Sequence, residues 1–258
     1  MNALKKKKII NAILFISLTL VITFVVVFAL VFNKPKYYTF GSYPQSLKAN
    51  DITITGQMDE RGYYIGSDAG YYEKVGEEYY KVEPIKWRIL KKKKGKALLV
   101  SEDILLMSRW GNIDANYEES SVRALLNDYF YYKAFSLSER ERVVLTVVDN
   151  SLQSANTEKV VSITTDGKGD SGRYKNTVDK VFLLSAEEVE KYGLGDDKGR
   201  VKNQFKEYAS YAGGRSSSWW LRSVYQNNAK CVLYGGSIAS TNKDSVNGVV
   251  PALWVKLK

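Results

Sequence analysis

The stretch Ser218-Trp219-Trp220-Leu221-Arg222-Ser223 places two adjacent tryptophans and one arginine in a short apolar run, and it decides how the last third of the chain folds. Runs of this length and composition favour a β-strand. Because neighbouring strand residues point to opposite faces, Trp219 and Trp220 cannot both line one surface. We therefore expect at least one indole in the core, and Arg222 on the same face as Trp220.

Short runs of the same kind, separated by Gly and Asn, recur along the chain. They predict strands in Asp51–Thr55, Pro84–Leu90, Lys96–Ser101, Val143–Val148, Ala229–Tyr234, Gly236–Ala239 and Gly248–Val255. Paired tyrosines between glycines predict further short strands over residues 63–80. The lysine-rich run 91–96 lies between two expected strands, so we interpret it as a charged hairpin turn rather than a binding patch.

Helix signals are fewer than strand signals. Apolar residues from Val122 to Tyr129 follow the spacing of one helical face. Capping-box spacings occur at Asn116/Glu119, at either Ser136/Glu139 or Ser138/Glu141, and at Ser185/Glu188. Gly193 is a suitable end for the helix that follows Ser185. Strands first, then helices, then strands again predict an α+β fold with short strands and two main helices.

Composition excludes several kinds of chemistry. The 258 residues contain 38 Lys and Arg, 28 Asp and Glu, no His, and a single cysteine, Cys231. Without His, the Ser-His-Asp and Cys-His mechanisms and His-ligated zinc are excluded. One cysteine forms neither an intrachain disulfide nor a metal-binding cluster. The sequence therefore nominates no catalytic residue, no metal and no cofactor, and an enzyme is the less favoured interpretation.

The N-terminal segment predicts the location of the chain. Lysines occupy positions 5–8, and residues 9–33 carry no charge. We expect a retained transmembrane helix over residues 9–32 in a lipid bilayer, with residues 1–8 in the cytoplasm. Residues 33–37 would be a tether and residues 38–258 one extracytoplasmic domain. The alternative is a cleaved signal peptide, whose apolar region is about 7–15 residues and ends at a small-x-small site. Phe28–Phe32 offers no such site.

The predicted outer part has a mild positive charge. Setting aside the four lysines of positions 5–8 reduces the net charge from +10 to +6. This charge is dispersed, so we expect no nucleic-acid partner, whereas an anionic polymer or a lipid headgroup is compatible with it. One compact domain of this length is feasible.

Eight ordered blocks carry a family resemblance. They are Phe40–Gln45, Glu83–Leu90, Ala97–Ser101, Ser121–Asn127, Ala134–Ser136, Asp179–Ser185, Trp219–Ser223 and Gly248–Trp254. Together they resemble the bacterial domain of unknown function 6273 from about Tyr38 to Leu257. That family has no established activity, so the resemblance implies no catalytic residue.

A looser resemblance concerns the end of the chain. The blocks Trp219–Ser223 and Gly248–Ala252 are similar to the closing pattern of formylglycine-generating-enzyme-like domains, a branch of the C-type lectin fold. This implies a C-type-lectin-like mixed fold. Val250 stands where the family usually has Arg, which weakens any ligand role for that position. Formylglycine-generating enzymes use a pair of cysteines, so the single Cys231 argues against that activity.

Five residues are candidates for ligand binding: Trp220, Arg222, Arg215, Arg123 and Asn127. Trp220 could stack on a sugar ring, or it could pack in the core. Arg222 could grip a carboxylate or phosphate, or it could pair internally with an acid such as Glu119 or Glu83. Arg215 follows two glycines and could help hold an anion. Arg123 and Asn127 share one side of the expected helix and could instead clamp a loop.

Two functions follow from these observations. The first is a membrane-anchored extracytoplasmic binding or interaction module without catalysis, whose partner would be a cell-envelope glycan, an anionic polymer or a protein. The alternative is an extracytoplasmic hydrolase that uses two carboxylates about 5–10 Å apart, which requires neither His nor Cys.

Overall fold

The computed structural model describes residues 11, 15–24, 35–151, 175–195, 200–201, 216–225 and 227–258. The chain divides into two compact units, Met1–Lys36 and Tyr37–Lys258. Arg215 lies outside the described residues.

In the first unit, residues 15–24 are helical. The Thr19 and Thr23 hydroxyls donate to carbonyls three or four residues earlier in the helix. The expectation of a transmembrane helix over residues 9–32 is corrected here. Across the part of the chain that is described, no helix combines the length and the apolar character needed to cross a membrane.

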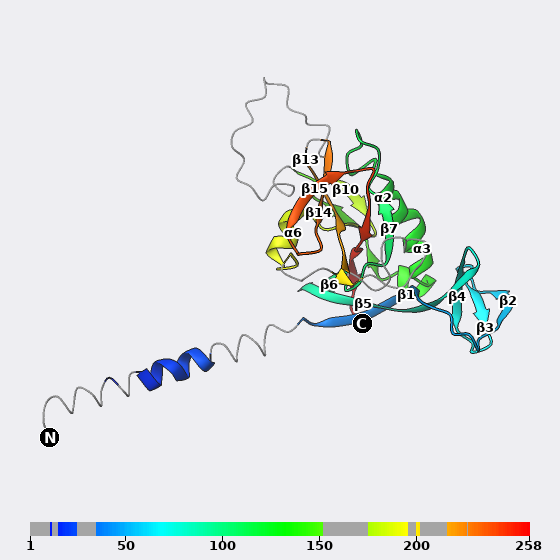
Figure 1. Ribbon diagram of the computed structural model, residues 1–258, viewed down its shortest axis with the longest axis horizontal. Helices are drawn as coiled ribbons and strands as arrows, with labels where there is room; N and C mark the ends of the chain where they lie inside the picture. The colour runs from blue at the N-terminus through cyan, green and yellow to red at the C-terminus, as the bar shows by residue number, and fades with distance from the viewer. Residues whose placement is uncertain are drawn as a thin grey trace, which may run out of the picture. The chain divides into compact units, whose positions relative to one another are not determined.

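The second unit is built on two antiparallel or mixed sheets (Figure 1). The larger one has eight strands in the order β2-β3-β4-β5-β6-β17-β8, with β1 paired to β5. Its strands are β1 (Tyr37–Leu47), β2 (Ile54–Met58), β3 (Tyr64–Gly66), β4 (Tyr71–Val75), β5 (Glu78–Lys93), β6 (Lys96–Ser101), β8 (Val143–Val144) and β17 (Ala252–Lys256). We call residues 54–75, which carry β2, β3 and β4, the arm, because Figure 1 shows them at one end of the unit.

The smaller sheet has five strands in the order β15-β14-β13-β16-β7. They are β7 (Leu106–Arg109), β13 (Trp219–Tyr225), β14 (Asn228–Val232), β15 (Ile238–Asn242) and β16 (Val246–Val249). Two ribbons complete the strands: β9 (Thr146–Val148) with β10 (Thr177–Asp179), and β11 (Arg200–Val201) with β12 (Ser216–Ser217).

The helices of the second unit are short. A helical segment runs through α2 (Ser121–Ala124), the π-helical turn η1 (Leu125–Phe130) and α3 (Tyr131–Ala134), and it is followed by α4 (Leu137–Arg140) and α6 (Ala186–Lys191). The capping box predicted at Ser185 is confirmed, and of the two alternatives Ser136 and Ser138 the structure has the box at Ser136. The one predicted at Asn116 is wrong as a helix start, because the N-cap is Ser120 and its hydroxyl accepts from the Arg123 amide.

The predicted fold class is wrong. Strands make up 46% of the structure and helices 19%, so the fold is mostly β rather than α+β with two main helices. The main cause is the length of β1 and β5, which are 11 and 16 residues long. The sequence predicted no strand over β1 and only part of β5, because sheet pairing continues through tyrosine- and lysine-rich segments that lack a clear apolar alternation.

Several strands are buried on both faces and separate two hydrophobic clusters. In β13 and β6, successive side chains enter opposite clusters, as the period of two in a strand requires. The first cluster includes Trp220, Val224, Ala97 and Leu99, and the second includes Trp219, Leu221, Leu98 and Val100. The prediction that the adjacent indoles of Trp219 and Trp220 face opposite sides is therefore confirmed, and both are core residues.

The lysine run 91–96 forms the predicted hairpin turn. Lys93 pairs with Lys96 across β5 and β6, and Lys94 and Gly95 connect the two strands. Both connecting residues have positive φ, 48° and 72°, as two-residue hairpin loops of type I′ require.

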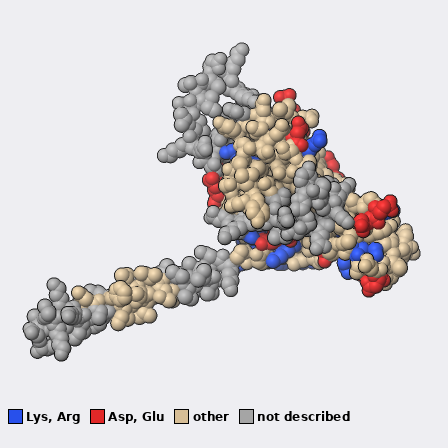
Figure 2. Space-filling view, viewed as in Figure 1, with Lys and Arg blue, Asp and Glu red and all other residues tan. Residues whose placement is uncertain are grey.

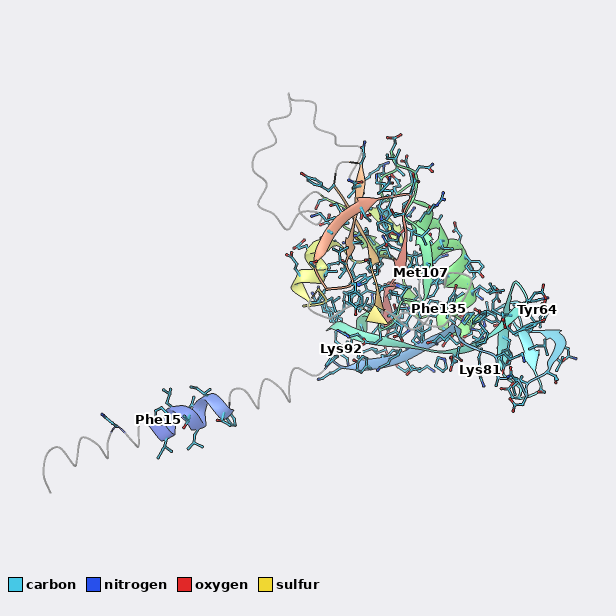
Figure 3. The ribbon with its side chains drawn as sticks, in the orientation of Figure 1. Phe15, Tyr64, Lys81, Lys92, Met107 and Phe135 are labelled. Carbon is cyan, nitrogen blue, oxygen red and sulfur yellow. The ribbon has the colours of Figure 1, made fainter. Side chains whose placement is uncertain are left out.

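An aromatic group joins the helical segment to the larger sheet. The Trp87 Nε1 atom donates to the Phe40 carbonyl at 2.6 Å, and the rings of Phe40 and Phe135 stack at 5.0 Å. Figure 3 labels Phe135. Gly41 follows Phe40 with φ +68°, and a Cβ built there would lie 2.5 Å from the Phe135 ring. A side chain at position 41 would therefore push the Phe135 ring away from Phe40.

We expect Gly41→Ala to lower the free energy of unfolding by about 2–4 kcal/mol, because it combines left-handed strain with overpacking. Gly76→Ala is the matched control: its φ is +58°, but no atom lies within 4 Å of a Cβ built there. Its expected loss is about 1 kcal/mol, from backbone strain alone. Urea unfolding curves measure both, and equal losses would contradict the packing argument.

Candidate functional site

The structure places Trp220 in the interior. Its side chain is 0% exposed, and its Nε1 atom donates to the Ser108 carbonyl at 2.8 Å. Trp219 is equally enclosed in the other cluster. Neither indole therefore offers a surface on which a sugar ring could stack in this conformation.

Arg222 is 5% exposed, and its guanidinium contacts Asp149 just after β9, Leu183 and Glu188 of α6. Its Nη1 atom donates to the Leu183 carbonyl at 2.9 Å and to Glu188 Oε2 at 2.5 Å. Its Nε and Nη2 atoms donate to the Asp149 carbonyl at 3.2 and 3.0 Å. The internal acid that the sequence reading allowed for is thus Glu188, not Glu119 or Glu83, and Glu188 also closes the capping box of α6.

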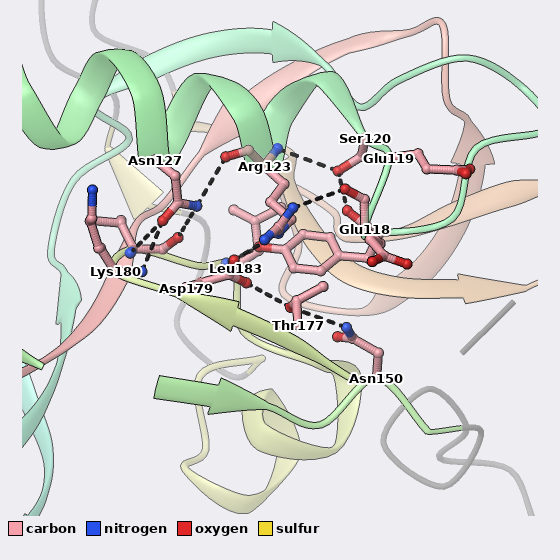
Figure 4. Close-up of polar contacts among 12 residues, drawn as sticks. Glu118, Glu119, Ser120, Arg123, Asn127, Asn150, Thr177, Asp179, Lys180 and Leu183 are labelled. Atoms are coloured by element: carbon pink, nitrogen blue, oxygen red, sulfur yellow. Dashed lines mark hydrogen bonds and ion pairs between the residues drawn. The ribbon is translucent and has the colours of Figure 1, made fainter. Parts of the chain in front are cut away.

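Arg123 and Asn127 are brought together on the helical segment and face the chain around β10 (Figure 4). Arg123 Nε donates to Asp179 Oδ1 at 2.7 Å, and Asp179 is buried. Asn127 accepts from the Lys180 amide at 2.8 Å and donates to the Val181 carbonyl at 2.9 Å. These contacts match the clamp that we weighed against ligand binding.

The polar network continues below this clamp. Asp179 Oδ2 accepts from the Thr177 hydroxyl at 2.7 Å, and Thr177 Oγ1 accepts from Asn150 Nδ2 at 3.3 Å. The Tyr117 hydroxyl accepts from the Leu183 amide at 3.1 Å, and burial raises the pKa of Tyr117. Arg123, Asn127 and Arg222 therefore use polar atoms to hold loops together, and their role in ligand binding stays a prediction.

A cavity that sequence reasoning missed lies between the arm and the helical segment. Its volume is about 310 Å³. It is lined by Glu60, Arg61, Asp128, Tyr129, Tyr132, Lys133 and Arg140. We call these residues the Tyr–cation cavity. The turn between β2 and β3 supplies the first two residues, and η1, α3 and α4 supply the others.

The arm is docked on one wall of this cavity by hydrogen bonds to one carbonyl. Tyr63 donates its hydroxyl to the Lys133 carbonyl at 3.0 Å, and Arg61 Nη1 donates to the same carbonyl at 3.4 Å. Arg61 also pairs with Asp59 at 3.2 Å and lies over the Tyr63 ring at 4.9 Å. Burial raises the pKa of Tyr63, so its hydroxyl stays protonated and remains a donor.

The opposite wall presents aromatic rings and cations to solvent. Tyr132 is 45% exposed, with the Arg140 guanidinium 5.1 Å from its ring centre. Lys180 Nζ donates to the Tyr132 hydroxyl at 3.3 Å. Lys133 pairs with Glu73 at 3.0 Å. Figure 2 shows both basic and acidic side chains on the arm.

The sequence contained a partial signal for this site. Residues 128, 129, 132 and 133 are spaced so that they share one side of a helix. Their partners in the arm lie about seventy residues earlier, as the separation of Tyr63 and Lys133 shows. No local pattern connects segments that far apart. Among the described residues, no group of three or more Cys, Asp and Glu side chains is placed to hold a metal ion.

The chain belongs to the family described as Domain of unknown function (DUF6273), whose sequence model matches residues 94–257. No curated protein and no solved structure matches the chain. The looser similarity to formylglycine-generating-enzyme-like and C-type-lectin-like domains is not shown. The matched range includes the helical wall of the Tyr–cation cavity and stops short of the arm.

Arg222→Gln is expected to lower the free energy of unfolding by about 3–5 kcal/mol, because it leaves the Glu188 carboxylate and two carbonyls without their cation. Arg109→Gln is the control, since Arg109 is exposed at the end of β7. Its expected effect is within about 0.5 kcal/mol. Denaturant unfolding measures both, and a loss below 1 kcal/mol for Arg222→Gln would show that the network is not a structural requirement.

Cys231 is expected to be chemically inert in the folded chain. It is 1% exposed, and burial raises the pKa of its thiol to about 11. At pH 8 only about 0.1% would then be thiolate, the form that reacts. A thiol reagent such as Ellman's reagent should react slowly with the native chain and rapidly after unfolding in guanidinium. Prompt reaction of the native chain would contradict this environment.

Proposed function

We propose that this chain is a non-catalytic binding module whose Tyr–cation cavity takes an acidic glycan, that is, a sugar bearing a carboxylate or phosphate. The observation that carries the proposal is the exposed Tyr132 ring beside the guanidinium of Arg140 and the ammonium of Lys180. An aromatic face can stack on the apolar face of a sugar, and the cations can bind its acidic group.

The cations beside Tyr132 favour an anionic ligand. Arg61 and Lys133 of the cavity already pair with Asp59 and Glu73, so the charge that a ligand meets next to the ring is that of Arg140. Lys180 adds a second cation beside Tyr132. Several of these groups are held in place before a ligand arrives, which lowers the ordering cost of binding.

The dimensions of the cavity favour a small group. A volume of about 310 Å³ lies at the low end of the range of ligand pockets, about 300–1,000 Å³. This size suits one ring of a chain end or side branch, whose remaining units stay in solvent. A cell-envelope polymer with acidic sugars is the source we propose, and the mild positive charge of the second unit agrees with it.

The test uses the full chain and isothermal titration with two oligosaccharides of equal length, one with a terminal hexuronate and one neutral. We expect saturable binding of the acidic oligosaccharide only. Tyr132→Ala should raise the Kd of the acidic oligosaccharide about fivefold, because it removes about 1 kcal/mol of ring contact. Tyr234→Ala is the control, since Tyr234 is exposed elsewhere.

Three results would overturn the proposal. The first is equal binding of the neutral oligosaccharide, and the second is equal weakening by the two tyrosine variants. The third is no binding of either sugar or of isolated envelope at moderate salt.

A hydrolase is the second candidate, because Glu60 and Asp128 both line the cavity. Two carboxylates in one cavity are the groups that glycoside hydrolysis uses. Binding is favoured because both side chains are exposed rather than enclosed around a bond to be cleaved. Release of a reducing sugar that Glu60→Gln abolishes would favour the hydrolase.

A further inference from the structure

A second surface, on other strands, carries exposed apolar side chains. Leu145 is 64% exposed, Val147 is 69% exposed and Val178 is 57% exposed. Val147 and Val178 are direct partners in the ribbon of β9 and β10, so their side chains share one face. Their neighbours Val148, Thr177 and Asp179 are buried, so the ribbon is packed on one side and presents its apolar valines on the other.

Leu145 and Val147 border a groove flanked by lysines. The groove has a volume of about 430 Å³. It is lined by Lys93, Lys94, Lys96, Val144, Leu145, Thr146, Val147 and Trp254. Among these described lining residues there is no acidic side chain. The acidic residues nearest in sequence to Val144–Val147 are Glu141 before it and Asp149 after it.

The positive charge around the groove extends along neighbouring strands. Lys91 and Lys92 are exposed just before the hairpin turn, and Figure 3 labels Lys92 on β5. Lys256 of β17 pairs with Lys96 of β6 and is also exposed. The hairpin therefore presents lysines at its tip next to an apolar face.

We infer that this face, made of Lys93, Lys94 and Lys96 with Leu145, Val147 and Val178, docks on an anionic lipid surface. Lysines near such a surface each favour binding about fivefold, and their long stems let the ammonium groups reach the headgroups. The apolar side chains enter the boundary between headgroups and acyl chains, where their burial removes them from water.

The apolar component is what selects a bilayer over other anionic partners. A soluble polyanion would neutralise the lysines and leave Leu145, Val147 and Val178 in water. A bilayer satisfies both halves of the face at once. This inference uses residues distinct from those of the Tyr–cation cavity, so either proposal can fail without the other.

The experiment reads the environment of the face in the full chain. Val147→Cys is labelled under native conditions with an environment-sensitive fluorophore, and the wild-type chain measures any background labelling at Cys231. The control is Leu137→Cys, because Leu137 is 62% exposed on α4. Vesicles contain either phosphatidylcholine alone or phosphatidylcholine with 30% phosphatidylglycerol.

We expect a blue shift at position 147 with the anionic vesicles, little shift with the neutral ones, and none at position 137. If the fluorophore at position 147 shows no blue shift with either vesicle type, the inference is overturned. So would equal shifts at the two positions or equal shifts with both lipids. Binding of a soluble polyphosphate that abolishes vesicle binding would support the charge component, whereas a blue shift with polyphosphate alone would overturn the lipid assignment.

A charge variant tests the lysines separately. Lys93→Gln with Lys94→Gln should raise the anionic lipid concentration at half-maximal shift by about 25-fold, from about fivefold per lysine. The control removes two charges elsewhere, Lys74→Gln with Lys191→Gln, and should change it less than threefold. Equal effects of the two pairs would show that net charge, rather than this face, drives association.

Discussion

Burial of β13 on both faces is the constraint on which the rest of the second unit depends. Trp219 and Trp220 are adjacent in the sequence but enter different hydrophobic clusters, so this strand separates and joins the two halves of the core. Its hydrogen-bonding neighbours β14 and β16 must therefore be central as well. A slip of one residue would exchange the two indoles and also drive the Arg222 side chain into an apolar cluster.

Arg222 is the polar counterpart of that constraint. It shares a strand with the two indoles, yet its guanidinium meets carbonyls of two loops and the carboxylate that caps α6. Arg123 and Asp179 make a comparable link between the helical segment and β10. Internal cation contacts of this kind fix how loops pass the core, since each loop must supply the acceptors that the cation requires. Both exposed candidate surfaces rest on this framework.

Local chemistry explains which expectations were confirmed. The Ser185 and Ser136 boxes, the Lys94-Gly95 turn and the opposed indoles each depend on residues a few positions apart. The fold class was wrong because strand pairing in β1 and β5 joins segments whose own patterns are weak. The predicted membrane span was not found among the described helices. The extracytoplasmic location and the envelope partners stay predictions.

The two candidate surfaces also depend on contacts between segments that are distant in the sequence. The sequence by itself determined the absence of histidine chemistry, the family, the turn chemistry and the two-sided burial around Trp219 and Trp220, because composition and short-range geometry are properties of the chain alone. Only the tertiary structure decided that Tyr132 meets an arm some seventy residues away and that Leu145 lies beside the lysine hairpin. Those neighbours are set by sheet pairing between distant segments, and the stability of such pairing is a sum over the whole core rather than a property of any one motif.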